Sequence, residues 1–173
     1  MELSDGIVTL REFREEDAAI ITPIANNAKI ASNLRDGFPH PYTIEDAKKF
    51  IENAQKQNPT ILFAIEFEGH YIGNIGLMPG EDVYIKSAEI GYFIGEPFWG
   101  LGLTTRAVSL ITEYGFNTLN LIRIDTGIYE HNKASMRVLE KCGYHKEAIF
   151  EKAIFKNGKI IDEHRYAKIN PSL

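Results

Sequence analysis

The spacing of apolar and polar residues along the 173-residue chain predicts a mixed α/β fold. Apolar residues 47, 50, 51 and 54 recur at helical spacing behind an N-cap residue at Thr43, which predicts a helix over 43–57. The predicted helices are 15–27, 43–57, 104–118 and 133–142, and the predicted strands are 7–13, 61–67, 71–77, 88–94, 123–129, 147–156 and 159–169. This order predicts a sheet with a meander in its middle and crossover connections later in the chain.

Glycine, proline and asparagine mark the turns between these elements. Asn157-Gly158 predicts a tight hairpin, and Glu68-Gly69 predicts a second one. Gly143 stands where a left-handed residue would end the helix 133–142. The segment 33–42 contains two prolines, a glycine and two aromatic residues, so we expect a loop.

Composition limits the class of protein. The net charge of −5 argues against general binding to nucleic acid or to an anionic membrane. The single cysteine, Cys142, cannot form an internal disulfide, and its place on the apolar face of a helix favours a buried thiol. The five histidines show no metal-ligand spacing, so no metal is expected. An acidic start without an apolar signal core, and no apolar run near 20 residues, predict a single cytoplasmic domain over 1–173.

A glycine-rich segment, 96–105, joins a predicted strand to a predicted helix. Two glycines before a helix let a ligand approach the backbone, and the free N–H groups there favour an anion such as pyrophosphate. A plain turn capped by Thr104 or Thr105 is the alternative. A P-loop is excluded because its motif is absent, and a dinucleotide-binding fold is disfavoured because Thr105 replaces the third glycine.

Two further polar residues are candidates for chemistry. Glu89 lies in a predicted central strand beside the small Gly91, where a carboxylate could act as a general base or form a salt bridge. Ser135 begins the apolar face of the helix 133–142, so its hydroxyl points inward, either to the helix backbone or to a ligand.

Taken together, these motifs resemble the GNAT acetyltransferase superfamily, and within it the RimJ/RimL-type N-acetyltransferases. The resemblance covers nearly the whole chain. It rests on Leu10-Arg11 with Asp17, on Ala88-Glu89-Ile90-Gly91-Tyr92, on Trp99-Gly100-Leu101-Gly102, and on the string from Asn132 and Ser135 to Gly143-Tyr144. It implies a GNAT-like α/β (α+β) fold with a mixed, mostly antiparallel seven-stranded sheet, splayed in the middle and flanked by about four helices.

The resemblance also implies a set of site residues. Acetyl-CoA would be held by the loop, the adjoining strand and the turn before the last helix: Phe93, Ile94, Gly100, Leu101, Gly102, Leu103, Thr104, Thr105 and Asn132. Glu89 and Ser135 would be catalytic, as base and acid. Apart from the resemblance, we expect the loop 34–42 before the second helix to bind the acceptor through Arg35, Phe38, His40 and Tyr42, because functional contacts concentrate on loops. Trp99, Leu101, Thr104 and Arg106 depart from the residues usual in this branch.

The expected function is direct transfer of an acetyl group from acetyl-CoA to a primary amine, with a protein N-terminus as acceptor. A small amine such as a polyamine, an amino acid or an aminoglycoside is the alternative acceptor, and Arg106 is shared with polyamine-acetylating relatives. A non-catalytic acyl-CoA-binding module is the alternative from another class. We expect no nucleic-acid or membrane partner, and a monomer or a homodimer.

Overall fold

The computed structural model describes residues 1–172, which form eight strands and five α-helices. They divide into two compact units. The first unit consists of Met1–Gly76 and Tyr92–Ile111, and the second of Leu77–Gly91 and the chain from Thr112 onward. The expectation of a single domain over 1–173 stays a prediction. None of the helices in the described part is long and apolar enough to cross a membrane.

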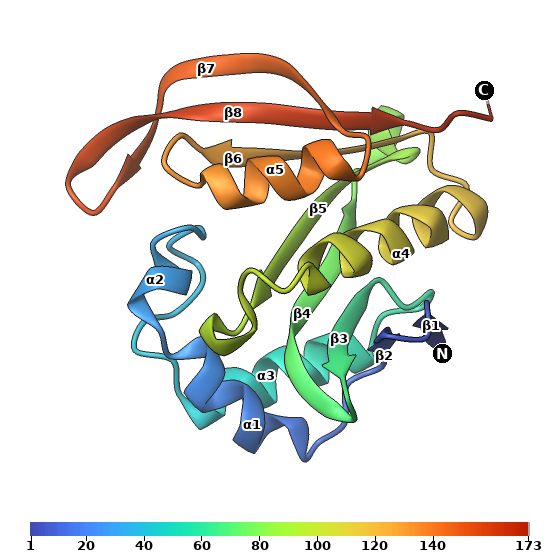
Figure 1. The fold of residues 1–173 in the computed structure, drawn as a ribbon, viewed down its shortest axis with the longest axis vertical. Coiled ribbons are helices and arrows are strands. Elements are labelled where there is room, and N and C mark those ends of the chain that lie inside the picture. Colours follow the sequence, from blue (N-terminus) through green and yellow to red (C-terminus); the bar gives the residue numbers. More distant parts are fainter. Residues whose placement is uncertain (173) are drawn as a thin grey trace. The chain divides into compact units, whose positions relative to one another are not determined.

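The first unit contains an antiparallel sheet with the strand order β1-β2-β3-β4 (Figure 1). Its strands are β1 (Glu2–Ser4), β2 (Val8–Arg11), β3 (Leu62–Phe67) and the part of β4 (His70–Pro79) that ends at Gly76. β1 adds an eighth strand to the seven expected. It is only three residues long, and its pairing with β2, rather than a pattern of its own, makes it a strand.

Three helices belong wholly to the first unit: α1 (Asp17–Ala25), α2 (Ala28–Ala31) and α3 (Ile44–Gln55). α1 and α3 lie side by side, and their apolar faces enclose a core with residues of β3 and β4 (Figure 1). The predicted cap of α3 is confirmed: Thr43 accepts from the Asp46 N–H, and Asp46 accepts from the Thr43 N–H, forming a capping box. The four-residue α2 was not predicted.

A buried ion-pair network connects β2 with α1 in the first unit. Arg11 donates to both carboxylate oxygens of Asp17, at 2.8 and 2.9 Å, and its Nε donates to Glu66 at 2.6 Å. Asp17 also accepts from the Arg14 N–H, which helps fix the start of α1. Although burial favours the neutral acid, the Arg11 guanidinium holds the pKa of Asp17 below its ordinary value.

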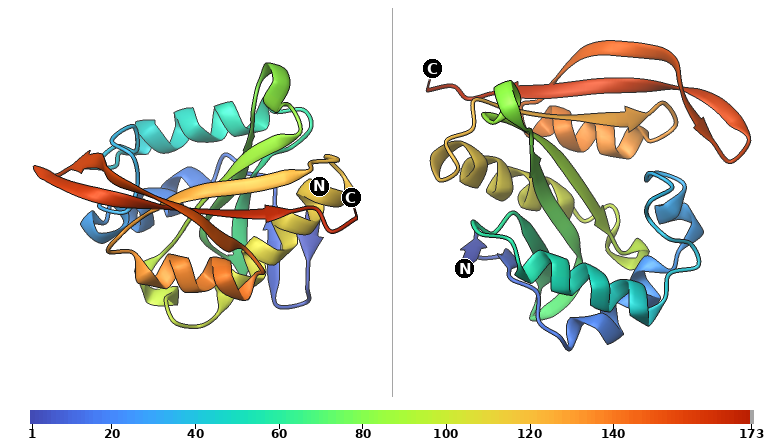
Figure 2. Two further views of the ribbon diagram at one scale, coloured as in Figure 1. Left: turned by 90° about the horizontal axis from the view of Figure 1, so that it is seen from above. Right: turned by 180° about the vertical axis from the view of Figure 1, so that it is seen from behind.

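The second unit contains a mixed sheet with the strand order β5-β6-β8-β7. β5 (Ser87–Ile94) leaves this unit after Gly91; it is parallel to β6 (Arg123–Tyr129), which is antiparallel to β8 (Lys159–Ile169). β7 (His145–Lys156) pairs with β8 in a long curved hairpin (Figures 1 and 2). The predicted Asn157-Gly158 turn closes this hairpin, with both residues at positive φ.

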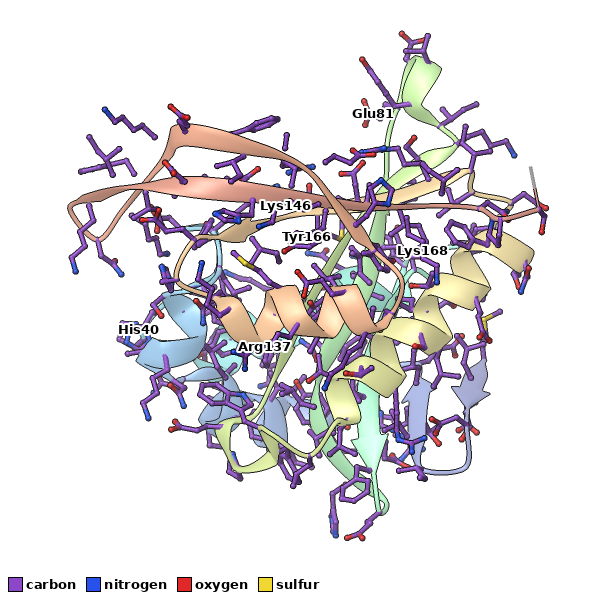
Figure 3. All side chains as sticks on the ribbon, turned by 45° about the horizontal axis from the view of Figure 1, so that its top comes forward. His40, Glu81, Arg137, Lys146, Tyr166 and Lys168 are labelled. Carbon is purple, nitrogen blue, oxygen red and sulfur yellow. The ribbon has the colours of Figure 1, made fainter. Side chains whose placement is uncertain are left out.

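Helix α5 (Lys133–Lys141) lies against the β6–β8 part of this sheet (Figures 1 and 2). Tyr166 donates to Glu140 at 2.9 Å, and Lys168 donates to the Cys142 carbonyl at 2.7 Å, so even-numbered residues of β8 face α5. Lys146 of β7 lies over the Tyr166 ring on the same face (Figure 3). The helix ends as predicted, with Gly143 at φ +82°.

Candidate active site

The glycine-rich loop lies wholly in the first unit. After β5 ends at Ile94, a short 3₁₀ helix, η2 (Glu96–Phe98), leads through Trp99 to helix α4 (Leu103–Asn117). Gly100 and Gly102 have φ of +77° and +76°, a conformation that disfavours every residue with a Cβ. An added Cβ at either position would meet nothing within 4 Å, so the backbone conformation, and not crowding, requires glycine here.

This loop presents a helix N-terminus beside exposed main chain. Gly100 and Leu101 are exposed, Thr104 and Thr105 are partly buried, and Leu103 is buried. The first N–H groups of a helix have no partner within the helix and attract anions. The structure therefore places the predicted residues 100–105 on this loop and in the first turn of α4, and anion binding there stays a prediction.

Two contacts fix the strand end from which the loop starts. The Trp99 indole Nε1 donates to the Ile94 carbonyl at 2.7 Å, and the Gly95 N–H donates to the Ile72 carbonyl at 2.8 Å. A Cβ on Gly73 would lie 2.9 Å from Ile94 Cα, so only glycine permits the close approach of β4 to this part of β5. Sequence analysis identified Trp99 as a departure from the residues usual at this position, but it could not predict the hydrogen bond from Trp99 to Ile94.

The predicted acceptor loop also belongs to the first unit. Arg35 and His40 are exposed, and Phe38 is partly buried against the core. The Phe38 ring lies 5.2 Å from the Tyr42 ring and 5.5 Å from the Phe93 ring, centroid to centroid. The structure thus brings one predicted acceptor residue into contact with one predicted cofactor residue.

Tyr42 is a core residue rather than part of an open wall. Only 6% of it is exposed, and its N–H donates to Asn26 Oδ1 at 3.1 Å. Burial, with a smaller effect from the Asp46 carboxylate, raises the pKa of Tyr42 to about 12. The phenol is therefore protonated throughout the neutral range, and truncation of Tyr42 would disturb the core.

Glu89 lies in the second unit, at the last residue pair of the parallel β5–β6 ladder. That ladder joins only three pairs and ends at Glu89 and Asp125, while β6 continues to pair with β8 as far as Tyr129. Glu89 is partly buried. The small Gly91 was expected to leave space beside Glu89. Met78 bounds this space, because its Cε would lie 3.1 Å from a Cβ added at Gly91.

Asp125, the neighbour of Glu89 in this ladder, is held by two arginines. Arg123 Nε donates to one oxygen at 2.8 Å and Arg165 Nη2 to the other at 2.7 Å. Arg165 also donates to Glu163 at 2.9 Å. Sequence reasoning missed this network, because Arg165 reaches Asp125 only through the register of β6 with β8.

Asn132 and Ser135 form the start of α5 in the second unit. Asn132 is the N-cap, and its Oδ1 accepts from the Ser135 N–H at 3.2 Å. Ser135 is 7% exposed, and Cys142, the C-cap of the same helix, is buried, as predicted for both. Ser135 lies on α5, which packs against the face of the sheet that carries the even-numbered residues of β8. Glu89 is paired with Asp125, and both side chains lie on the opposite face of the sheet. The structure therefore does not place these two residues on the same face of this unit's sheet.

Comparisons with known proteins agree with this fold. A family model described as an acetyltransferase (GNAT) domain matches residues 8–145. The chain therefore belongs to the GNAT acetyltransferase family, and it is an N-acetyltransferase, as the sequence predicted.

Three similar proteins illustrate the range of the family. Probable N-acetyltransferase YjcK of Bacillus subtilis is 34% identical over 164 residues, covering 87% of this chain and 91% of that protein. RimL, the ribosomal L7/L12 α-N-protein acetyltransferase solved with coenzyme A, superposes with a TM-score of 0.87 at 19% identity, covering 98% of each chain. Spermidine N-acetyltransferase of Vibrio cholerae, solved with CoA and spermine, has a TM-score of 0.81 at 24% identity, covering 96% and 97%. The two solved structures confirm the fold.

Proposed function

We propose that this enzyme transfers an acetyl group from acetyl-CoA directly to a primary amine, and that the amine is the N-terminal α-amine of a protein. The observation that supports this best is the pair of left-handed glycines, Gly100 and Gly102, directly before helix α4. Both RimL and the V. cholerae spermidine N-acetyltransferase were solved with CoA.

The residues of the loop fit the pyrophosphate of acetyl-CoA. The main-chain N–H groups of residues 101–105 would hold it, because the glycines leave the backbone uncovered and the helix dipole favours negative charge. Phe93 and Ile94 would line the path of the pantetheine arm, and Asn132 would lie near that arm. When bound, acetyl-CoA supplies a thioester carbonyl for attack and a thiol as leaving group.

The protein's own contribution is mainly to hold the amine and the donor together. Such positioning can lower a barrier by about 7–11 kcal/mol, whereas a general acid or base adds roughly 10²–10⁴-fold. We assign Ser135 as the group that protonates the leaving thiolate, and Glu89 as the group that orders a water to take the amine proton. The end of the β5–β6 ladder beside Glu89 supports this assignment, because main-chain pairing between these strands stops there.

The acceptor determines how much a base matters. An α-amine with a pKa near 7.8 is roughly 14% neutral at pH 7, while a lysine-type amine near 10.4 is well under about 0.1% neutral. A protein N-terminus therefore needs little help from Glu89. Arg35, Phe38 and His40 are the residues that we assign to acceptor selection, since Tyr42 is buried.

A polyamine is the second candidate acceptor. It is favoured by the likeness to a spermidine acetyltransferase that was solved with spermine and by the acidic net charge of −5. A polyamine would depend more strongly on a base, because its amines are almost fully protonated at neutral pH.

The decisive experiment follows acetyl-CoA-dependent thiol release with N-terminal peptides, spermidine, single amino acids and an aminoglycoside. Turnover of peptides with a free α-amine, and not of N-blocked copies, is the expected result. Preference for spermidine would replace the protein acceptor with the second candidate. Tight CoA binding without turnover of any of these amines would place the acceptor outside the classes tested. The cytoplasmic location and the monomeric or homodimeric state stay predictions.

A further inference from the structure

Two segments of the first unit, to which the proposed function assigns different ligands, are in direct contact. We call residues 26–42 the acceptor segment and residues 93–105 the cofactor segment. They touch at two places, one at the start of the acceptor segment and one near its end.

The first contact is centred on Glu96, the first residue of η2. Asn27 Nδ2 donates to Glu96 Oε2 at 2.8 Å, and Lys29 Nζ forms an ion pair with Glu96 Oε1. Asn27 is also the N-cap of α2, since its Oδ1 accepts from the Lys29 N–H at 2.8 Å. Each oxygen of Glu96 therefore binds a different residue at the start of α2.

The charge and the packing around Glu96 strengthen this connection. Lys29 and then Asn27 hold the pKa of Glu96 below its ordinary value, so the carboxylate stays charged at neutral pH. Beside it, Ile24 of α1 packs so closely on Gly95 that an added Cβ would lie 3.0 Å from Ile24 Cγ2. The end of α1 thus rests directly on the residue before Glu96.

The second contact is aromatic. The rings of Phe38 and Phe93 meet edge to face, with centroids 5.5 Å apart. Phe93 and Glu96 are only three residues apart, so the same short stretch of the cofactor segment contacts both ends of the acceptor segment. Between these ends, the Tyr42 N–H is bound to Asn26, which closes the acceptor segment on itself at 3.1 Å.

The two side chains that bind the Glu96 carboxylate, Asn27 and Lys29, both lie at the junction of α1 and α2. We propose that Glu96 is a positioning residue that transmits occupancy of the cofactor segment to the acceptor segment, so that binding of acetyl-CoA orders residues 26–42 for the amine. This inference rests on the proposed function, because it needs CoA to bind at the cofactor segment. Glu96 acts through Asn27 and Lys29 and is not a catalytic residue.

Amide hydrogen exchange with CoA as the probe tests this coupling without any knowledge of the acceptor. In the wild-type protein, CoA is expected to slow exchange in both segments, by about fivefold or more in residues 26–42, the lower end of ordinary site-to-site coupling. In Glu96→Ala, the slowing is expected to persist in residues 93–105 and to be lost in residues 26–42. Glu96→Gln keeps an acceptor for Asn27 but loses the charge that binds Lys29, so it should retain part of the effect.

Glu52→Ala is the matched control. Glu52 of α3 forms an exposed ion pair with Lys56, the C-cap of that helix; these are the same residue types as Glu96 and Lys29, and neither belongs to either segment. The Glu52→Ala protein should show the same CoA-dependent slowing of amide exchange in both segments as the wild type. Protection of 93–105 without protection of 26–42 in the wild type, or full protection of both in Glu96→Ala, would overturn the coupling alone. If CoA protects neither segment, the proposed function fails, and this inference fails with it.

Discussion

Replacement of Gly102 by valine separates the role of the loop in binding from its role in folding. Gly102 has φ +76° and no atom within 4 Å of an added Cβ, so the cost to folding comes from backbone conformation alone. A residue with a Cβ in this conformation costs roughly 1–2 kcal/mol. In a chain of this size each kcal/mol lowers Tm by about 2–4 °C, so the expected loss is roughly 2–8 °C.

The chain contains a matched control for this change. Gly69, in the β3–β4 hairpin turn, also has φ +76° and also has nothing within 4 Å of an added Cβ. Gly69→Val should therefore lose about the same thermal stability, by the same conformational argument. The two variants differ in the position of the strained residue, which is the β3–β4 turn in one and the loop before α4 in the other.

Calorimetric titration with acetyl-CoA distinguishes the two positions. Gly102→Val should bind about tenfold more weakly or worse, a loss of about 1.4 kcal/mol, because the side chain and the altered backbone disturb the cradle for pyrophosphate. Gly69→Val should bind as the wild type does. Equal affinity for all three folded proteins would refute the placement of pyrophosphate at this loop.

Three further predictions concern catalysis and stability. Ser135→Ala should lower kcat more than it changes the Kd for acetyl-CoA, and a fully active variant with an unchanged pH profile would leave Ser135 only a role in the helix start. Glu89→Gln should reduce kcat/KM increasingly as pH falls from about 9 to about 6, where more amine is protonated; wild-type rates across that range would make Glu89 structural. Asp17→Asn should cost about 3–5 kcal/mol in urea unfolding, because it leaves the buried Arg11 partly unpaired. Since the folded-state pKa of Asp17 is lowered, this stabilisation is present above its unfolded pKa of about 3.9 and is lost as pH falls through the folded value. An Asp17→Asn protein as stable as wild type at neutral pH would contradict the last prediction.

Features that depend on neighbours in the sequence could be predicted from the sequence alone. The N-cap at Thr43, the left-handed Gly143 and the Asn157-Gly158 turn were all predicted. Each joins residues a few positions apart, so local stereochemistry decides it with little help from the rest of the fold. The glycine loop before α4 belongs to the same class, which is why its place directly before a helix was predictable.

Features that join distant residues were decided only by the tertiary structure. The bond from Asn27 to Glu96 spans 69 positions, and the bond from Arg165 to Asp125 spans 40. Strand β1 exists through its pairing with β2, and Tyr42 is buried because α1 and α3 enclose it, although the loop pattern around it predicted exposure. Strand register and helix packing set these contacts, and a one-residue change in register would place each side chain on the other face. The sequence therefore determined the local shape of the cofactor loop, whereas only the packed structure determined which residues of the acceptor segment touch it.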